Sequence, residues 1–290
     1  MQKVLITGCS GYIGQHLAKW MSDKYEVYGL DIVEPADPSP FKKIILIDIR
    51  CPFEDFLFDM DEVPLEYDTV IHLAALVQVN ESMANPSDYY DTNLNGTLNL
   101  LDAIKFKNFV FASTGAAQNP ISPYAVSKIA AEHCVREYCY KNQIKYTVFR
   151  FYNVIGTGGY PPTNPDGLFY NLLKSKETGE FKIFGNDYNT KDGTPVRDYI
   201  HVLEVCHALE LATRKPAYVP GAEFVSLLEN LGHGKGHTVL EIFTAFCKVN
   251  NLDIKLEYVP RRWGDAEKTV LDNPSPYMLQ LYTLEDYVRI

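Results

Sequence analysis

The sequence has no long hydrophobic run and no closely spaced pair of cysteines. Its apolar stretches are strand-sized, as at residues 44–47, whereas a membrane-spanning helix needs about 20 consecutive apolar residues. The six cysteines are scattered and contain no Cys-x-x-Cys pair. We therefore expect no membrane span, no zinc knuckle and no disulfide framework.

Basic charge is also in short supply. The chain carries 27 Lys and Arg against 37 Asp and Glu, a net charge of −10, with no block of five or more like charges. Binders of nucleic acid or anionic membranes normally carry a basic patch, so we expect neither partner. The chain runs from Met1 directly into a strand pattern, without an apolar leader, which together with the scattered cysteines predicts a cytoplasmic protein.

The remaining composition, 46% hydrophobic and 22% charged over 290 residues, is typical of one large or two closely packed globular domains. Helical patterns that begin near Gly11, after Pro86 and near Pro123 alternate with short apolar runs in the first half of the chain. The runs span residues 4–7, 27–30, 44–47, 70–73, 109–112 and 146–150. Apolar strands separated by helices predict an α/β protein with a Rossmann-type doubly wound parallel sheet.

The composition of the sequence changes after Arg150. Seven glycines and prolines crowd into residues 156–167, and the later elements are shorter and more mixed. This change predicts a Rossmann-type domain at residues 1–151 and a smaller mixed α/β domain at residues 152–290. The family resemblance described below implies that the second domain mainly binds the substrate.

A glycine-rich turn follows the first predicted strand and opens the first predicted helix. Its Gly8, Gly11 and Gly14 are spaced as Gly-x-x-Gly-x-x-Gly, which allows a tight turn and lets the backbone approach a pyrophosphate at the helix N-terminus. The alternative is a plain strand-to-helix turn.

Two aspartates end neighbouring strand patterns. Asp31 lies seventeen residues past Gly14, near the spacing at which a carboxylate binds the ribose hydroxyls, and its charge favours NAD over NADP. The alternative for Asp31 is a solvated loop residue. Asp48 stands where it could bind an adenine amino group or cap a helix, and the sequence leaves both roles open.

Tyr124 and Lys128 lie four residues apart on a predicted helix and project from one face. The Tyr-x-x-x-Lys spacing occurs twice, and context separates the two pairs. The first follows a strand that ends at Thr114, at the edge where open α/β sheets bind ligands. The second, Tyr170 and Lys174, is predicted to lie on a helix surface.

Nine segments of the sequence resemble extended short-chain dehydrogenases/reductases, and among them the nucleotide-sugar 4-epimerases of the UDP-glucose 4-epimerase type. They are TGCSGYIG at 7–14, DIR at 48–50, HLAALVQVNES at 72–82, NLNGT at 93–97, PYAVSK at 123–128, RFYN at 150–153, IFGNDYNTKDGTPVRDYIHV at 183–202, NLG at 230–232 and PRRWGD at 260–265. The glycine turn and Tyr-x-x-x-Lys specify only the superfamily, whereas the 183–202 block and PRRWGD are much narrower.

The resemblance implies roles for individual residues. Tyr124 is the expected catalytic base, Lys128 binds the nicotinamide ribose, and Thr114 bonds the reacting sugar hydroxyl. A free tyrosine has a pKa of about 10, so we expect a nearby ammonium and the nicotinium charge to lower the pKa of Tyr124. The implied cofactor contacts are Gly8, Gly11, Tyr12, Ile13, Gly14, Asp31, Asp48, Ile49, Leu73, Ala74, Ala75, Tyr124, Lys128 and Tyr152. The implied substrate contacts are Thr114, Asn153, Phe184, Arg197, Tyr199, Arg262 and Asp265, with the two arginines facing a diphosphate.

The activity implied by the resemblance is an NAD-dependent inversion of C4 of a UDP-sugar through a transient 4-keto sugar, with NAD recycled. The substrates would be UDP-glucose and UDP-galactose, as in galactose metabolism, or their N-acetyl forms. A homodimer is expected by the same analogy. The alternatives are a nucleotide-sugar reductase or dehydratase of the same superfamily and a catalytically idle NAD or nucleotide-sugar sensor.

Several positions depart from the family pattern. Only nine residues separate Thr114 from Tyr124, where a longer loop is usual, and Val77 stands in place of a lysine. Gly115 and the two alanines after it replace the acidic residue that dehydratases need, which argues for epimerisation. Thr269 stands at a gate position whose small size suggests that N-acetyl sugars fit. His233 and His237 lie among glycines, so we expect them to be in a loop, and we expect no metal site there.

Overall fold

The computed structural model describes residues 1–51, 64, 66–214, 227–262, 265–275 and 277–290. The chain divides into two compact units, one of Met1–Phe151 with Cys206–Glu229 and the other of Tyr152–Val205 with Asn230–Ile290. Residues 206–229 therefore belong with the N-terminal half of the chain. No helix in the described part of the chain is both long enough and apolar enough to cross a membrane.

The first unit is built on a seven-stranded sheet in the order β10-β6-β5-β4-β1-β2-β3. The strands are β1 (Lys3–Thr7), β2 (Glu26–Asp31), β3 (Lys43–Leu46), β4 (Glu66–His72), β5 (Lys105–Thr114), β6 (Lys145–Phe151) and β10 (Leu227–Leu231). Strands β1 to β6 pair in parallel, and the order reverses between β1 and β4, which is the topological switch point where such sheets bind ligands. The predicted Rossmann-type sheet is confirmed.

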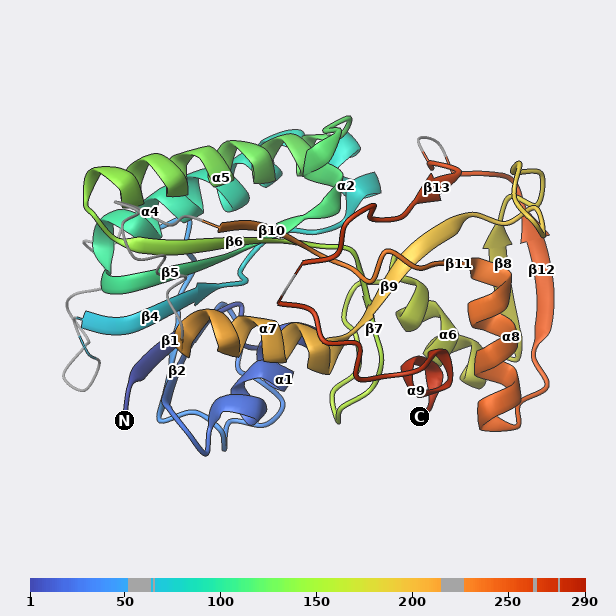
Figure 1. Cartoon of the computed structure of the whole chain (residues 1–290), viewed down its shortest axis with the longest axis horizontal. Helices are drawn as coiled ribbons and strands as arrows, with labels where there is room; N and C mark the ends of the chain where they lie inside the picture. The colour runs from blue at the N-terminus through green and yellow to red at the C-terminus, as the bar shows by residue number, and fades with distance from the viewer. Residues whose placement is uncertain (52–63, 65, 215–226, 263–264, 276) are drawn as a thin grey trace. The chain divides into compact units, whose positions relative to one another are not determined.

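Helices cover both faces of this sheet, with α4 and α5 on one face and α1 and α7 on the other (Figure 1). The helices are α1 (Tyr12–Met21), α2 (Val79–Ala84), α3 (Pro86–Tyr90), the π-helical turn η2 (Asp91–Asn95), α4 (Gly96–Ala103), the 3₁₀ turn η3 (Gly115–Gln118), α5 (Pro123–Lys141) and α7 (Val202–Arg214). Coverage on both faces explains why the strands are continuously apolar.

Helix α5 begins where the sequence provides a strong start signal. The Ser122 hydroxyl accepts a hydrogen bond from the backbone N–H of Ala125 at 3.2 Å, and Pro123 occupies the first helical position, where its missing N–H costs nothing. This start fixes Tyr124 in the first turn of α5, close to the carboxyl end of β5.

The second unit is a smaller mixed α/β structure. Its strands are β7 (Asn153–Ile155), β8 (Glu180–Phe184), β9 (Val196–His201), β11 (Gly236–Thr238), β12 (Lys255–Val259) and β13 (Lys268–Thr269), and its helices are α6 (Leu168–Thr178), α8 (Val239–Asn250) and α9 (Leu284–Val288). Strand β9 is central, since β7 and β13 pair with it in parallel and β11 pairs antiparallel. Strands β8 and β12 form a separate parallel pair.

Candidate active site

The glycine turn after β1 is packed too tightly to accept side chains. Gly8 adopts φ +69°, and a Cβ there would lie 2.7 Å from the backbone nitrogen of Ala74. A Cβ on Gly14 would overlap the carbonyl oxygen of Gly8 and lie 2.8 Å from the Cα of Cys9. Glycine at these two positions is therefore a steric requirement of the turn itself.

The segment that follows β4 lies against this turn. The backbone N–H of Leu73 donates to the carbonyl oxygen of Thr7 at 3.1 Å, and the N–H of Ala74 donates to the Thr7 hydroxyl at 3.2 Å. The turn and the segment that begins with Leu73 and Ala74 thus meet at the point where the strand order reverses, and the cofactor contacts of Leu73, Ala74 and Ala75 stay predictions.

Asp31 also lies at the turn. Its Oδ2 accepts a hydrogen bond from the backbone N–H of Ser10 at 2.8 Å, and its Oδ1 accepts one from Ile32 at 2.7 Å. Gly11 provides the N-cap of α1, and the first helical turn with Tyr12 and Ile13 is neutral. A glycine-rich turn, a helix N-terminus without acidic residues in its first turn and a carboxylate at the end of β2 together fit the pyrophosphate and ribose of NAD.

Asp48 and Ile49 follow β3. The Asp48 carboxylate accepts hydrogen bonds from the backbone N–H of Arg50 at 2.9 Å and from its guanidinium, and the ion pair with Arg50 lowers the pKa of Asp48. Within the described residues Asp48 thus stabilises a turn. Ile49 is buried against Gly96, so packing explains its side chain, and the contacts of both residues with a cofactor stay predictions.

Thr114, Tyr124 and Lys128 come together between the end of β5 and α5. The Thr114 and Tyr124 side chains are hydrogen-bonded. Lys128 is buried at 3% exposure, with its Nζ 4.3 Å from the centroid of the Phe111 ring, and Tyr124 packs edge-on against Tyr89. The predicted catalytic residues therefore lie at the carboxyl end of β5 and on the first two turns of α5.

Burial is the main influence on the pKa values of Tyr124 and Lys128. Burial raises the pKa of Tyr124, and the hydrogen bond with Thr114 opposes this increase only in part. Burial also lowers the pKa of Lys128 to about 7, against the opposing effect of Glu132. Among the chain's own groups, desolvation of the phenolate therefore outweighs the hydrogen bond that lowers the pKa of Tyr124. The lowering expected from the nicotinium charge of bound NAD stays a prediction.

A buried hydrogen-bond chain, which the sequence did not reveal, joins the glycine turn to α5. His72 Nδ1 lies 2.6 Å from the Thr7 hydroxyl, and its Nε2 lies 3.0 Å from the Thr97 hydroxyl. The Thr97 hydroxyl donates to the carbonyl of Asn93, whose side chain donates to Ser127 on α5. Because Thr97 uses its proton on that carbonyl, His72 donates from Nε2 and accepts at Nδ1.

In the second unit, three of the predicted substrate residues lie on β9 and its partner strand β7, and a fourth, Asp265, precedes β13. Arg197 Nη2 is 3.2 Å from Asp265 Oδ1, and Thr269 of β13 is the register partner of Arg197. Asn153 of β7 is the register partner of Tyr199 and donates to the carbonyl of Asp198 at 3.0 Å.

Phe184 and Arg262 meet at the ends of β8 and β12. These strands pair in register, with Val259 opposite Phe184, and the Arg262 guanidinium carbon lies 3.9 Å from the Phe184 ring centroid. Stacking on the ring orients the guanidinium plane. The remaining PRRWGD residues at 263–264 lie outside the described residues.

Packing and backbone contacts account for two further predicted residues, Tyr199 and Tyr152. Tyr199 is 2% exposed and belongs to the hydrophobic core of the second unit, so packing accounts for it and its substrate contact stays a prediction. Tyr152 begins the second unit, where its backbone N–H donates to the carbonyl of Leu231, and its cofactor contact also stays a prediction.

Comparison with known proteins identifies the family. The profile of the NAD dependent epimerase/dehydratase family matches residues 4–226. This chain belongs to that family.

Individual relatives extend the match over nearly the whole chain. A UDP-glucose 4-epimerase of Lactobacillus helveticus is 34% identical over 301 residues, covering 93% of this chain and 88% of the relative. The structure of a UDP-glucose 4-epimerase from Brucella ovis in complex with NAD superposes with a TM-score of 0.86 at 27% identity, covering 100% of this chain and 97% of that one. A Thermotoga maritima UDP-glucose 4-epimerase with UDP-glucose gives 0.83 at 27% identity, covering 99% and 96%.

The structure describes two of the positions at which this chain departs from the family pattern. The short segment after Thr114 becomes the single 3₁₀ turn η3, whose first backbone N–H groups include that of Ala116, bonded to the Thr114 hydroxyl at 3.2 Å. Val77 is 42% exposed. The short connection therefore places Thr114 at the N-cap of a single 3₁₀ turn.

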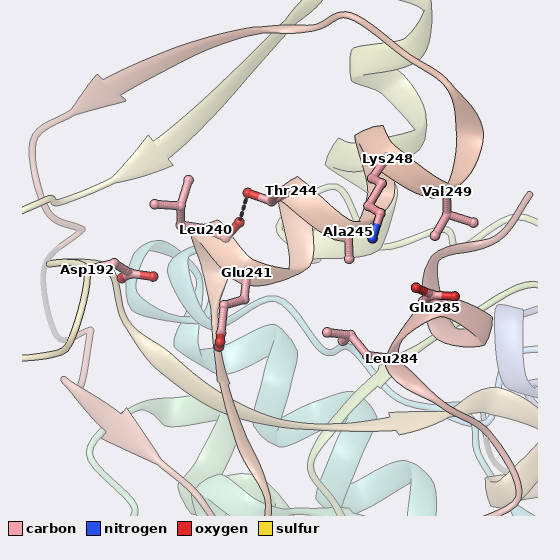
Figure 2. Close-up of a pocket in the computed structure, with 9 residues that line it drawn as sticks. All are labelled: Asp192, Leu240, Glu241, Thr244, Ala245, Lys248, Val249, Leu284 and Glu285. Carbon is pink, nitrogen blue, oxygen red and sulfur yellow. Dashed lines mark hydrogen bonds between the residues drawn. The ribbon is translucent and has the colours of Figure 1, made fainter.

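A separate hollow lies on the second unit, between α8 and α9 (Figure 2). It is lined by Asp192, Leu240, Glu241, Thr244, Ala245, Lys248, Val249, Leu284 and Glu285. It shares no residue with the predicted site, and one of its acidic residues, Glu241, caps α8 and pairs with Lys191. His233, one of the two glycine-flanked histidines, bonds Glu204 at 2.8 Å.

Proposed function

We propose that the protein is an NAD-dependent nucleotide-sugar 4-epimerase that inverts C4 of a UDP-sugar, either UDP-glucose and UDP-galactose or their N-acetyl forms. The observation that carries the proposal is the hydrogen-bonded pair Thr114 and Tyr124 with Lys128 buried one helical turn further along α5. The relatives named above, one with NAD and another with UDP-glucose, support this chemistry.

Tyr124 and Thr114 act on the sugar hydroxyl at C4. Thr114 orients the hydroxyl and Tyr124 removes its proton, so that a ketone forms at C4, and Tyr124 returns the proton when the ketone is reduced. Lys128 donates hydrogen bonds to the ribose and, when protonated, favours the phenolate of Tyr124. Bound NAD supplies the hydride acceptor and donor for C4, together with the positive charge that Tyr124 needs to become a base.

The second unit supplies the contacts for the nucleotide. Arg197 and Arg262 carry guanidinium groups suited to bidentate bonds with a diphosphate, and the stack on Phe184 holds Arg262 in a fixed plane. Asp265, paired with Arg197, accepts hydrogen bonds from the nucleoside. Asn153 and Tyr199 complete the proposed set.

Incubation of the purified protein with UDP-glucose or UDP-galactose tests the proposal. We expect each sugar to be converted to the same equilibrium mixture without stoichiometric consumption of NADH. A reductase would consume one NADH for each sugar, a dehydratase would release a 4-keto sugar, and a sensor would bind NAD without converting either substrate. Any of these three outcomes would refute the proposed epimerisation.

Thr269 is the proposed determinant of the sugar's size. Its register position beside Arg197 places a small side chain next to a proposed diphosphate ligand, so we expect the N-acetyl forms to be accepted. Thr269→Tyr should lower kcat/KM for UDP-N-acetylglucosamine by about tenfold or more relative to UDP-glucose, because a bulkier residue fills the space. An unchanged ratio of the two kcat/KM values would contradict this role.

We also propose a homodimer formed by the helices on the α4–α5 face of the first unit. Apolar side chains are exposed along them, including Met83, Tyr90, Leu98 and Val126, each at least 36% exposed, and exposed apolar surface favours association. Light scattering should give twice the mass of 32.9 kDa, and a monomeric mass would contradict it. A cytoplasmic location agrees with all six cysteines being unpaired.

A further inference from the structure

A buried carboxylate lies behind the proposed catalytic residues, and the roles given above do not use it. Glu132 lies on α5, four residues past Lys128 and eight past Tyr124, so the three side chains follow one face of the helix. Glu132 is 8% exposed, and burying an ionised carboxylate requires partners.

The partners come from both strands that lie next to α5. Glu132 Oε1 accepts hydrogen bonds from Ser113 Oγ at 2.5 Å and from Arg150 Nε at 2.8 Å. Its Oε2 accepts a bond from Arg150 Nη2 at 2.5 Å. Ser113 of β5 and Arg150 of β6 are register partners, so one carboxylate ties α5 to two adjacent strands. Ser113 directly precedes Thr114, which bonds Tyr124.

Stability alone is a weak explanation for this arrangement. The free energy needed to remove two charges from water is about as large as the attraction between them in the interior. Well-packed apolar residues in their place often stabilise a protein equally or better. What a bidentate guanidinium–carboxylate pair provides is fixed geometry. Here the geometry it fixes is the position of α5 relative to the end of β5.

We propose that Glu132 is a positioning residue for the epimerisation, which holds Lys128 and Tyr124 of α5 in place against Thr114 through its bonds to Ser113 and Arg150 and keeps Lys128 charged. The inference rests on the proposed function, and it adds a residue that touches neither the sugar nor the cofactor.

The charge part of the proposal follows from the surroundings of Lys128. On its own helix Lys128 faces Tyr124 and Glu132. From β4 it interacts with His72, whose pKa burial lowers to about 3, so this histidine is neutral near pH 7. From β6 comes Arg150, which is paired with Glu132. Burial lowers the pKa of Lys128 to about 7, and Glu132 is the group that raises it.

Calorimetric titration of NAD between about pH 6 and pH 9 tests this charge effect directly. Lys128 loses its proton as the pH rises through its pKa, so NAD affinity should fall on the alkaline side. Glu132→Gln removes the negative charge and leaves Arg150 unpaired, which lowers the pKa of Lys128. The alkaline fall in NAD affinity should therefore begin at a pH lower by at least about half a unit than in the unaltered protein.

Glu132→Asp distinguishes the effect of the negative charge from the effect of side-chain length. It keeps the carboxylate but shortens it by one methylene, so the alkaline fall should stay within about 0.3 pH units of the unaltered protein, while kcat should drop about tenfold because α5 is less firmly held. Glu210→Gln is the matched control, since Glu210 is also buried and paired with two cations, Lys24 and Arg214, but has no proposed part in the reaction. It should lower the melting temperature without moving the pH dependence or kcat.

The proposal is overturned if Glu132→Gln destabilises the protein like Glu210→Gln but leaves both the alkaline fall and kcat unchanged. Should Glu132→Gln not fold, the double variant Glu132→Gln with Arg150→Met, which leaves no unpaired charge, takes its place. Its kcat at saturating NAD should be at least about tenfold reduced, and a kcat within twofold of the unaltered protein would overturn the positioning role. The NAD titration does not depend on epimerisation, so failure of the proposed function would be seen separately, as absence of sugar conversion by the unaltered protein.

Discussion

Replacement of Tyr124 by phenylalanine should reduce kcat for UDP-sugar interconversion by about 1,000-fold, within the range for loss of a general acid–base group. Phenylalanine fills the same space against Tyr89 but cannot take up the proton of the sugar hydroxyl. NAD affinity and the melting temperature should change little, because the ring packing seen in the structure is preserved. Steady-state kinetics in both directions, with a parallel NAD titration, provide the measurement.

The chain offers a matched control for this substitution. Tyr170 and Lys174 repeat the Tyr-x-x-x-Lys spacing on α6, in the second unit. Tyr170→Phe should leave kcat within about twofold of the unaltered protein, because Tyr124 bonds Thr114 at the sheet edge that binds ligands and Tyr170 lies on α6 of the other unit. The account fails if Tyr124→Phe retains more than about one-fifth of the activity.

Gly14→Ala should weaken NAD binding by about 100-fold, or about 2.7 kcal/mol. The added methyl group would overlap the carbonyl oxygen of Gly8 and crowd Cys9, so the turn has to open and its backbone N–H groups move away from the pyrophosphate position. Measured Kd values for NAD, together with thermal melting, separate loss of binding from loss of the fold.

Alanine substitutions at two other glycines serve as controls for Gly14→Ala. A Cβ on Gly11, in the same turn, would lie 3.2 Å from the Gly8 oxygen, a contact that a small shift relieves, so Gly11→Ala should weaken NAD binding less than Gly14→Ala. Gly179 has φ +75° but open space around its Cβ position. Gly179→Ala should cost about 1 kcal/mol in unfolding free energy and leave the Kd unchanged. Unaltered NAD affinity in Gly14→Ala would contradict the assignment of the turn.

The fold of the first unit was predictable because its signals are local. Continuous apolar runs such as Val4–Thr7 predict buried parallel strands, and the structure has β1 at Lys3–Thr7. Ser122 and Pro123 mark the start of α5 within one residue. Residues 206–214 and 227–229, by contrast, belong to the first unit although they lie far along the chain, and no local pattern in the sequence predicts this.

The candidate site was predictable to a different extent in its two parts. Motif spacing was enough to predict that the glycine turn, Asp31 and the Tyr124–Lys128 pair lie at one edge of the sheet. The residues of the second unit came only from resemblance, because the register that places Thr269 beside Arg197 depends on pairing between distant strands.

Buried polar groups were the main omission. Glu132 continues the four-residue spacing of Tyr124 and Lys128, which is a signal in the sequence, but its partners Ser113 and Arg150 depend on the packing of α5 against β5 and β6. His72 is similar, since its two threonine partners lie 65 and 25 residues away. Burial raises the pKa of Tyr124 in the chain by itself, and the sequence could not show this contribution because burial is a property of the folded chain.

The central claim, a C4 inversion in which Tyr124 moves the proton while the hydride never leaves the enzyme, is tested most directly with UDP-glucose deuterated at C4. We expect mass spectrometry and NMR to find the UDP-galactose product with deuterium fully retained at C4, and no NADH accumulating in solution. Deuterium lost to water, or one NADH formed for each sugar converted, would contradict the account.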